Sequence, residues 1–217
     1  MRLVLALSAA LLAAPVAQAA TTTPFTLDFS GDICTTTTGA CTNGSSISQD
    51  YGDIAGMLDI IYDANRNTPA SDDLRHWGSG YETLANVAYG TNGGGGLSIL
   101  FQPLAGHVVT ITGFDIAPYA NRSRNTLVQV IDTATDALLV DDDFAPLPTG
   151  VVTSFSGTWT SASGIQINLG PDAWDVGISN ITGSVSVIPL PAAGWLLLGA
   201  LAGLGLAARR RRTATAA

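Results

Sequence analysis

The chain contains no lysine, and only four of its nine arginines lie between residues 20 and 187. All 17 acidic residues fall in that same range, which therefore has a formal charge of about −13. A surface of this sign repels nucleic acid, because binding there depends on cations that neutralise phosphates. It suits surroundings rich in salt or divalent cations, which screen or bridge carboxylates, but it also serves plain solubility.

Signatures of catalysis are missing as well. The sequence has no G-x-S-x-G, no H-E-x-x-H and no lysine for a phosphate-binding loop. Glu82 is the single glutamate, so a glycosidase pair would need at least one aspartate. We therefore expect no catalytic residues and a protein that is not an enzyme. The alternative is a polysaccharide-modifying hydrolase or lyase that uses aspartates.

Cysteine is scarce, with a single pair at Cys34 and Cys41. Two cysteines so close together are expected to form a disulfide in a chain that is exported, as the first residues of this one indicate below. The closed loop is short, so its constraint on the unfolded chain contributes roughly 2–3 kcal/mol. No further cysteine joins the pair, which argues against a metal site there.

The first 19 residues have the pattern of a secretory signal peptide. Arg2 precedes an apolar stretch, Pro15 interrupts it, and Ala17-Gln18-Ala19 has the small residues that signal peptidase requires. The apolar stretch falls short of the roughly 18 residues that a membrane span needs. We predict cleavage between Ala19 and Ala20, followed by one domain over residues 20–187.

Residues 188–217 are predicted to anchor the chain in a membrane. The uncharged run from Ile188 to Ala208 would span about 30 Å as a helix, which matches a bilayer core. A cluster of four arginines follows directly and is expected to stay in the cytoplasm. The cluster consists of Arg209, Arg210, Arg211 and Arg212. The domain before this helix is then outside the cytoplasm.

Apolar residues between the two ends alternate with a period of two, which predicts strands rather than helices. The predicted strands are Phe25–Phe29, Leu58–Tyr62, Leu97–Phe101, His107–Ile116, Thr126–Asp132, Ala137–Asp141, Ser154–Thr160, Ile165–Leu169 and Trp174–Ile181. Gly113 lies where the alternation changes register, which indicates a β-bulge. So many short strands predict an all-β fold, an antiparallel β-sandwich of the jelly-roll kind.

The tail resembles the VPLPA-CTERM subclass of the PEP-CTERM bacterial sorting signals. It has their three parts: a proline-containing motif, an apolar helix and a terminal arginine cluster. The motif consists of Ile188, Pro189, Leu190, Pro191 and Ala192, with isoleucine where the subclass has valine. This resemblance implies recognition by an exosortase, a membrane-embedded cysteine transpeptidase of bacteria that make exopolysaccharide. It implies a final location at the cell surface or in the extracellular matrix.

The stretch from Asp172 to Ile181 looks like the last strand of galactose-binding-like jelly rolls. The resemblance implies a strand that packs an aromatic residue and two isoleucines into the core. Ser179 stands where those folds have an acidic residue, so that position does not carry over as a ligand. A shared fold does not establish sugar binding.

A calcium site is one interpretation of the segment that begins at Asp63. Asp63, Asn65 and Asn67 place oxygen ligands at alternate positions, and Asp72 follows shortly after. The segment is not an EF-hand, because Thr68 and Pro69 occupy the place where that loop needs glycine. An ordinary turn rich in asparagine and aspartate is the alternative interpretation.

Three aromatic residues near turns, Trp77, Tyr81 and Tyr119, are candidates for a ligand platform. Aromatic rings stack on the apolar faces of sugars, although such residues also serve the core or its rim. The sequence therefore favours a non-catalytic surface or matrix protein that binds polysaccharide. The alternatives are the aspartate-based enzyme and a structural spacer without a ligand.

Overall fold

The computed structural model describes residues 21–35, 41–64, 74–91 and 95–188. Residues Thr21–Ile188 form a compact unit. The predicted signal peptide and all of the tail beyond Ile188 lie outside the described residues. The described part contains no helix, and so none that could cross a membrane. Its eleven strands are β1 (Thr22–Leu27), β2 (Leu58–Asp63), β3 (Arg75–Trp77), β4 (Val87–Tyr89), β5 (Leu97–Pro103), β6 (His107–Pro118), β7 (Arg124–Asp132), β8 (Ala137–Leu147), β9 (Thr153–Ser161), β10 (Ile165–Gly170) and β11 (Val176–Val187).

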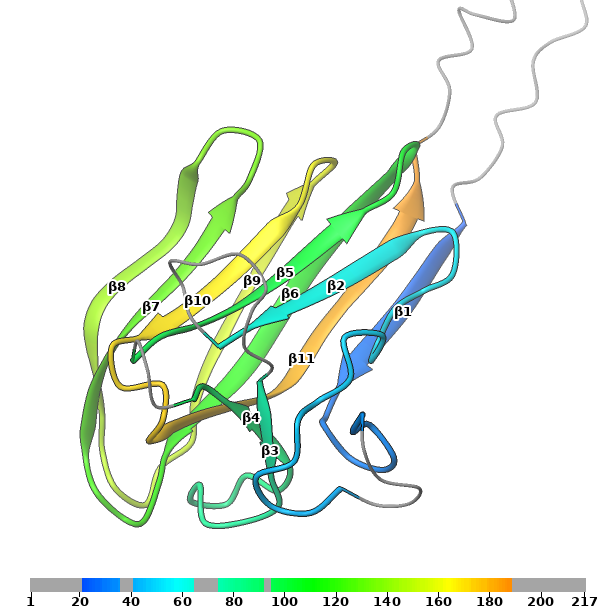
Figure 1. Ribbon diagram of the computed structural model, residues 1–217. Coiled ribbons are helices and arrows are strands. Elements are labelled where there is room, and N and C mark those ends of the chain that lie inside the picture. The colour runs from blue at the N-terminus through cyan, green and yellow to red at the C-terminus, as the bar shows by residue number, and fades with distance from the viewer. Residues whose placement is uncertain (1–20, 36–40, 65–73, 92–94, 189–217) are drawn as a thin grey trace, which may run out of the picture. The chain divides into compact units, whose positions relative to one another are not determined.

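The strands form two antiparallel sheets that face each other as a β-sandwich (Figure 1). One sheet has the order β3-β4-β11-β6-β9, and β1 pairs with β11 beside this path. The other has the order β2-β5-β10-β7-β8. The all-β antiparallel prediction is confirmed, and each predicted strand has a counterpart. The short strands β3 and β4 were not predicted, because three residues are too few for alternation to show.

Alternating apolar residues from both sheets meet in one core. Ile60 and Tyr62 of β2, Ile99 and Phe101 of β5, and Val109 of β6 are all completely buried. Each is separated from the next core residue of its strand by one outward-facing residue, as the pleat of a strand requires. Burial of these side chains is the main stabilising contribution to the sandwich.

A β-bulge lies at Gly113, as the sequence predicts. The register of β6 shifts there against both neighbours, between Ile111 and Gly113 opposite β9 and around Thr182 opposite β11. A Cβ at Gly113 would lie 2.8 Å from the carbonyl oxygen of Phe155. The close approach of β9 therefore explains why this position has no side chain.

Strand β8 continues to Leu147, although the alternation predicted an end at Asp141. It is an edge strand, with β7 as its one neighbour in the sheet. Pro146 pairs opposite Asn125. An edge strand tolerates proline, because one side of its backbone needs no partner strand.

The pairing registers define two opposite ends of the sandwich. Thr22 pairs with Ser186 and His107 with Val187, so both Thr21 and Ile188 lie at the end that also holds the β5–β6, β7–β8 and β9–β10 turns. We call this the exit end. The opposite end holds the β6–β7, β8–β9 and β10–β11 connections together with β3 and β4, and we call it the aromatic end (Figure 1).

Candidate functional site

Five aromatic side chains gather at the aromatic end, from three separate parts of the chain. Trp77 and Tyr89 lie on the paired strands β3 and β4, and Tyr81 lies on the loop between them. Tyr119 follows β6, and Trp174 precedes β11. The ring centroids are 5.8 Å apart for Trp77–Tyr119, 5.0 Å for Tyr81–Tyr119 and 5.5 Å for Tyr89–Trp174. Edge-to-face and tilted contacts at such distances are favourable for aromatic pairs.

The five rings differ sharply in exposure. Tyr81 is 2 % exposed and Tyr89 is 4 % exposed, so these two rings support the cluster from within. Trp77 and Tyr119 are half-buried, and Trp174 is 46 % exposed. Accessible ring surface therefore comes from Trp77, Tyr119 and Trp174. The structure brings the three predicted platform residues together, but it leaves the ring of Tyr81 covered.

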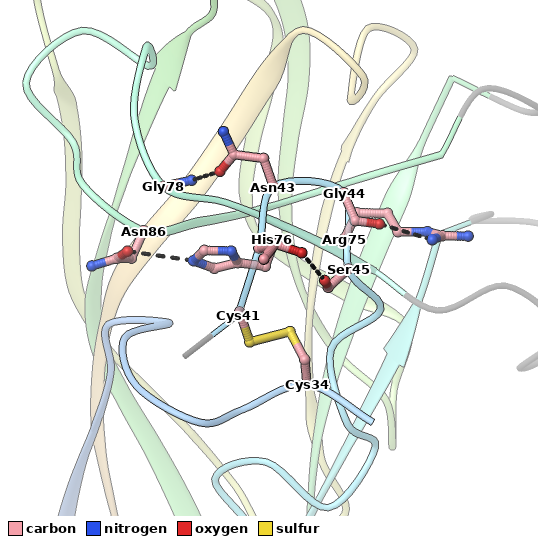
Figure 2. Close-up of a disulfide and its surroundings, with 10 residues drawn as sticks. Cys34, Cys41, Asn43, Gly44, Ser45, Arg75, His76, Gly78 and Asn86 are labelled. Atoms are coloured by element: carbon pink, nitrogen blue, oxygen red, sulfur yellow. Dashed lines mark hydrogen bonds between the residues drawn. A yellow bond between two sulfur atoms is a disulfide. The ribbon is translucent and has the colours of Figure 1, made fainter. Parts of the chain in front are cut away.

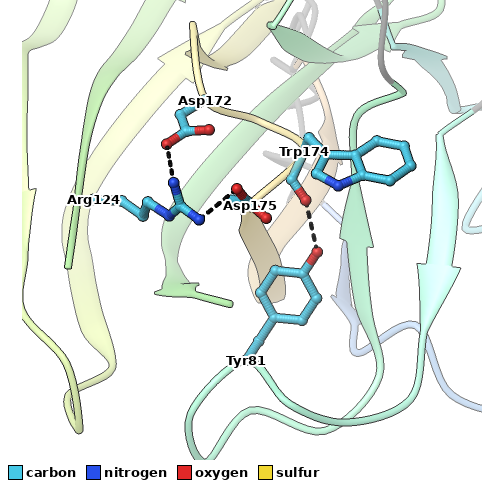
Figure 3. Close-up of polar contacts among 5 residues, drawn as sticks. All are labelled: Tyr81, Arg124, Asp172, Trp174 and Asp175. Carbon is cyan, nitrogen blue, oxygen red and sulfur yellow. Dashed lines mark hydrogen bonds and ion pairs between the residues drawn. The ribbon is translucent and has the colours of Figure 1, made fainter. Parts of the chain in front are cut away.

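The buried hydroxyl of Tyr81 holds the loop that carries Trp174. It donates a hydrogen bond of 3.0 Å to the carbonyl oxygen of Trp174 (Figure 3). Burial raises the pKa of Tyr81 above its ordinary value of 10.0. The hydroxyl therefore keeps its proton at neutral pH and remains a donor. This bond joins the β3–β4 loop to the loop before β11.

Arg124 binds two aspartates that flank Trp174. Its Nη1 lies 3.3 Å from Asp172 Oδ2, and its Nη2 lies 2.5 Å from Asp175 Oδ2 (Figure 3). Burial raises the pKa of Asp172, and the positive charge of Arg124 opposes that rise. Arg124, the first residue of β7, thus holds the loop on both sides of Trp174.

Backbone contacts fix the same loop from its other side. Ala173 donates to the carbonyl oxygen of Gly95 and accepts from the amide of Gly90, both at 2.9 Å. Gly95 has a positive φ of 68°, and a Cβ there would lie 2.0 Å from the carbonyl oxygen of Pro171. Only glycine fits at this position. Trp174 is therefore exposed on a well-supported loop.

Sequence reasoning missed Trp174 as a site residue, because the alternation placed it inside the last strand. The strand begins at Val176, and Trp174 points outward from the preceding loop. Ile178 and Ile181 are fully buried, as the resemblance implies, whereas the aromatic residue is not. The Gly170-Pro171-Asp172 turn just before it was the available signal.

Ser179 has a structural role in the core. It is completely buried, and its Oγ donates to the carbonyl oxygen of Asn86 at 2.9 Å. Its Oγ also lies 3.4 Å from the carbonyl oxygen of Asp28. The hydroxyl is thus hydrogen-bonded to the backbone within the fold and is not available to a ligand.

A disulfide joins Cys34 and Cys41, which confirms the predicted pairing (Figure 2). The chain after Cys41 runs beside β3: Gly44 donates to the carbonyl oxygen of His76, and His76 donates to that of Ser45. The ring Nε2 of His76 lies 3.3 Å from Asn86 Oδ1. The disulfide therefore lies directly before the segment that pairs with β3.

Of the four predicted calcium ligands, Asp63 lies among the described residues. Asp63, the last residue of β2, is 8 % exposed. Asn65, Asn67 and Asp72 lie outside the described residues. Within the described ranges, no three histidine, cysteine, aspartate or glutamate side chains form a group suited to a metal.

Comparison with known protein families finds no matching family model, and no curated protein matches the chain. The aromatic end must therefore be interpreted from its own chemistry.

Proposed function

We propose that the chain is an exported bacterial surface or matrix protein that binds polysaccharide non-catalytically at its aromatic end. The observation that carries this proposal is the exposure of Trp174 on a supported loop, where its ring contacts Tyr89 and is linked through it to the half-buried ring of Trp77. Exposed apolar surface that is contiguous, and not scattered as single residues, marks interaction sites on soluble proteins. Tryptophan offers a flat apolar face at low conformational cost.

Sugars present apolar C–H faces together with ring hydroxyls, and the aromatic end provides a complement to both. The exposed ring supplies the stacking surface, and Asp172 and Asp175, on the same loop, supply carboxylate acceptors. Arg124 restrains these carboxylates in advance, which reduces the entropy lost on binding. A neutral or cationic glycan is favoured over an anionic one, since residues 20–187 have a formal charge of about −13.

Export and sorting follow from the two ends of the chain. Signal peptidase would cut between Ala19 and Ala20, and an exosortase would act at the motif Ile188–Ala192. The uncut precursor would be anchored in the inner membrane by its tail, with the domain outside the cytoplasm.

The strand orders β1-β11-β6-β9 and β5-β10-β7-β8 support a jelly roll, with β2 added at one edge.

Trp174→Ala tests the ligand site. Binding of the variant would be measured on a glycan array and on exopolysaccharide from the host envelope. We expect affinity to fall at least about tenfold, equivalent to about 1.4 kcal/mol. Leu104→Ala is the matched control, because Leu104 is 41 % exposed but lies at the exit end.

Two outcomes would favour another function. Product release from the polysaccharide, lost on substitution of one aspartate, would indicate the aspartate-based enzyme. An array on which the wild-type protein binds no glycan would indicate a structural spacer.

A further inference from the structure

Large apolar side chains that are exposed are distributed unevenly over the described residues. Seven such side chains are exposed, and five of them lie at the exit end. These five, the exit rim, are Leu104, Leu138, Leu139, Val187 and Ile188, with exposed fractions of 41 %, 48 %, 39 %, 41 % and 41 %. The other two, Val151 and Trp174, lie at the aromatic end.

Strand pairing places the members of the exit rim on one end of the sandwich. Leu104 lies in the β5–β6 turn and donates its amide to Met57, and Ile188 donates to Gly106 in the same turn. Leu138 and Leu139 lie just after the β7–β8 turn, where Asp132 pairs with Ala137. Since β5 and β8 are three strands apart in their sheet, the rim extends about 14 Å across it.

The chain itself indicates what covers this rim. Ile188 is the last described residue of the domain and the first residue of the uncharged run to Ala208. If that run spans the membrane, the bilayer surface begins within a few residues of the exit end, since each residue extends at most about 3.5 Å. The rim then faces the lipid interface without any linker long enough to hold it away.

We infer that the exit rim docks onto the surface of the bilayer that holds the tail, on the side away from the cytoplasm, while the tail is in place. This inference rests on the membrane anchoring proposed above, and not on glycan binding. The rim is aliphatic, which suits insertion between lipid headgroups, where apolar area removed from water is stabilising. Asp132 and Asp136 lie at the same end, so a zwitterionic surface is favoured over an anionic one.

Docking would have a consequence for sorting. It would restrict rotation of the domain about its tail and hold the motif Ile188–Ala192 at the depth of the interface. It would also direct the aromatic end away from the membrane, where polysaccharide is accessible.

The test uses the full chain with its tail in phosphatidylcholine vesicles. Leu104→Cys and Val151→Cys would each be labelled with the polarity-sensitive dye NBD, since Cys34 and Cys41 are bonded to each other. Spin-labelled phosphatidylcholine serves as the quencher. We expect a blue-shifted emission and strong quenching at residue 104. We expect aqueous emission and no quenching at residue 151, which is 47 % exposed at the opposite end.

Flotation of the vesicles separates this inference from its premise. A chain that floats with the vesicles but shows equal quenching at both positions is anchored and not docked, which overturns the inference. A chain that does not float overturns the anchoring itself. A blue shift at residue 104 without lipid quenching would mean that a second copy covers the rim, and this too overturns the inference.

Discussion

Asp28 and Asp53, near the start of the domain, show that local contacts decide whether a carboxylate stabilises or destabilises the folded state. The carboxylate of Asp28 accepts hydrogen bonds from the amide of Ser30 at 3.0 Å and from its hydroxyl at 2.8 Å. These bonds favour the charged form and lower the pKa of Asp28 below its ordinary 3.8. Burial raises the pKa of Asp53, and the bond it accepts from the amide of Ile60 only partly offsets that rise.

Opposite pH dependences follow for the two positions. The carboxylate of Asp28 stabilises the folded domain above pH 3.8, and this stabilisation is lost as the pH falls through the lower pKa that Asp28 has in the folded state. Asp28→Asn should therefore destabilise the domain at pH 7 and have a smaller effect at pH 3. The contribution of Asp53 is unfavourable above its raised folded pKa and disappears as pH falls through that value.

Asp53→Asn should therefore gain stability relative to the wild type at pH 7, and this difference should shrink in acid. Urea unfolding at pH 7 and pH 3 would measure both variants. The same pH response from the two variants would mean that overall charge, and not local bonding, governs both positions.

At the scale of elements, two glycines with similar backbone conformation have different surroundings. Gly95 has φ 68° and its Cβ position is blocked by the backbone of Pro171 at 2.0 Å. Gly106 has φ 84°, and nothing lies within 4 Å of its Cβ position. Substitution at Gly106 therefore measures the cost of a left-handed backbone alone, whereas substitution at Gly95 also includes the clash between two loops.

Gly106→Ala should destabilise the domain by about 1 kcal/mol, since alanine in the left-handed region costs about that much. Gly95→Ala should cost several kcal/mol, because the loop that carries Trp174 would also have to move. Urea unfolding gives both values, and tryptophan fluorescence reports the movement of the loop. Equal destabilisation by the two substitutions would show that the loops are not closely packed.

At the scale of the whole molecule, the central question is what happens to the tail. Both Thr21 and Ile188 lie at the exit end. Removal of residues before Thr21 or after Ile188 therefore leaves the paired strands β1 and β11 intact. Processing at both ends is therefore compatible with a folded domain.

If the motif is cut, envelope-extracted protein should begin at Ala20 and lack the four arginines of residues 209–212. Intact-mass measurement decides this directly, and any group added by the transpeptidase would appear as extra mass. A species from Ala20 to Ala217 would show that the tail is a permanent anchor. Substitution of Pro189 and Pro191 by alanine should produce that uncut species if the motif is recognised.

The order of residues along the chain determined the fold class, nine strands, the bulge at Gly113 and the bond between Cys34 and Cys41. Each of these depends on neighbours within about ten residues, where alternation and spacing are visible. The tertiary structure alone decided which aromatic residues are covered. Tyr81 and Trp174 are 93 residues apart in the chain, and yet the fold joins them by a hydrogen bond, with the ring of Tyr81 buried and that of Trp174 exposed. It also decided that five exposed apolar side chains share the exit end, because strand pairing, and not sequence distance, brings the turns of a sandwich together.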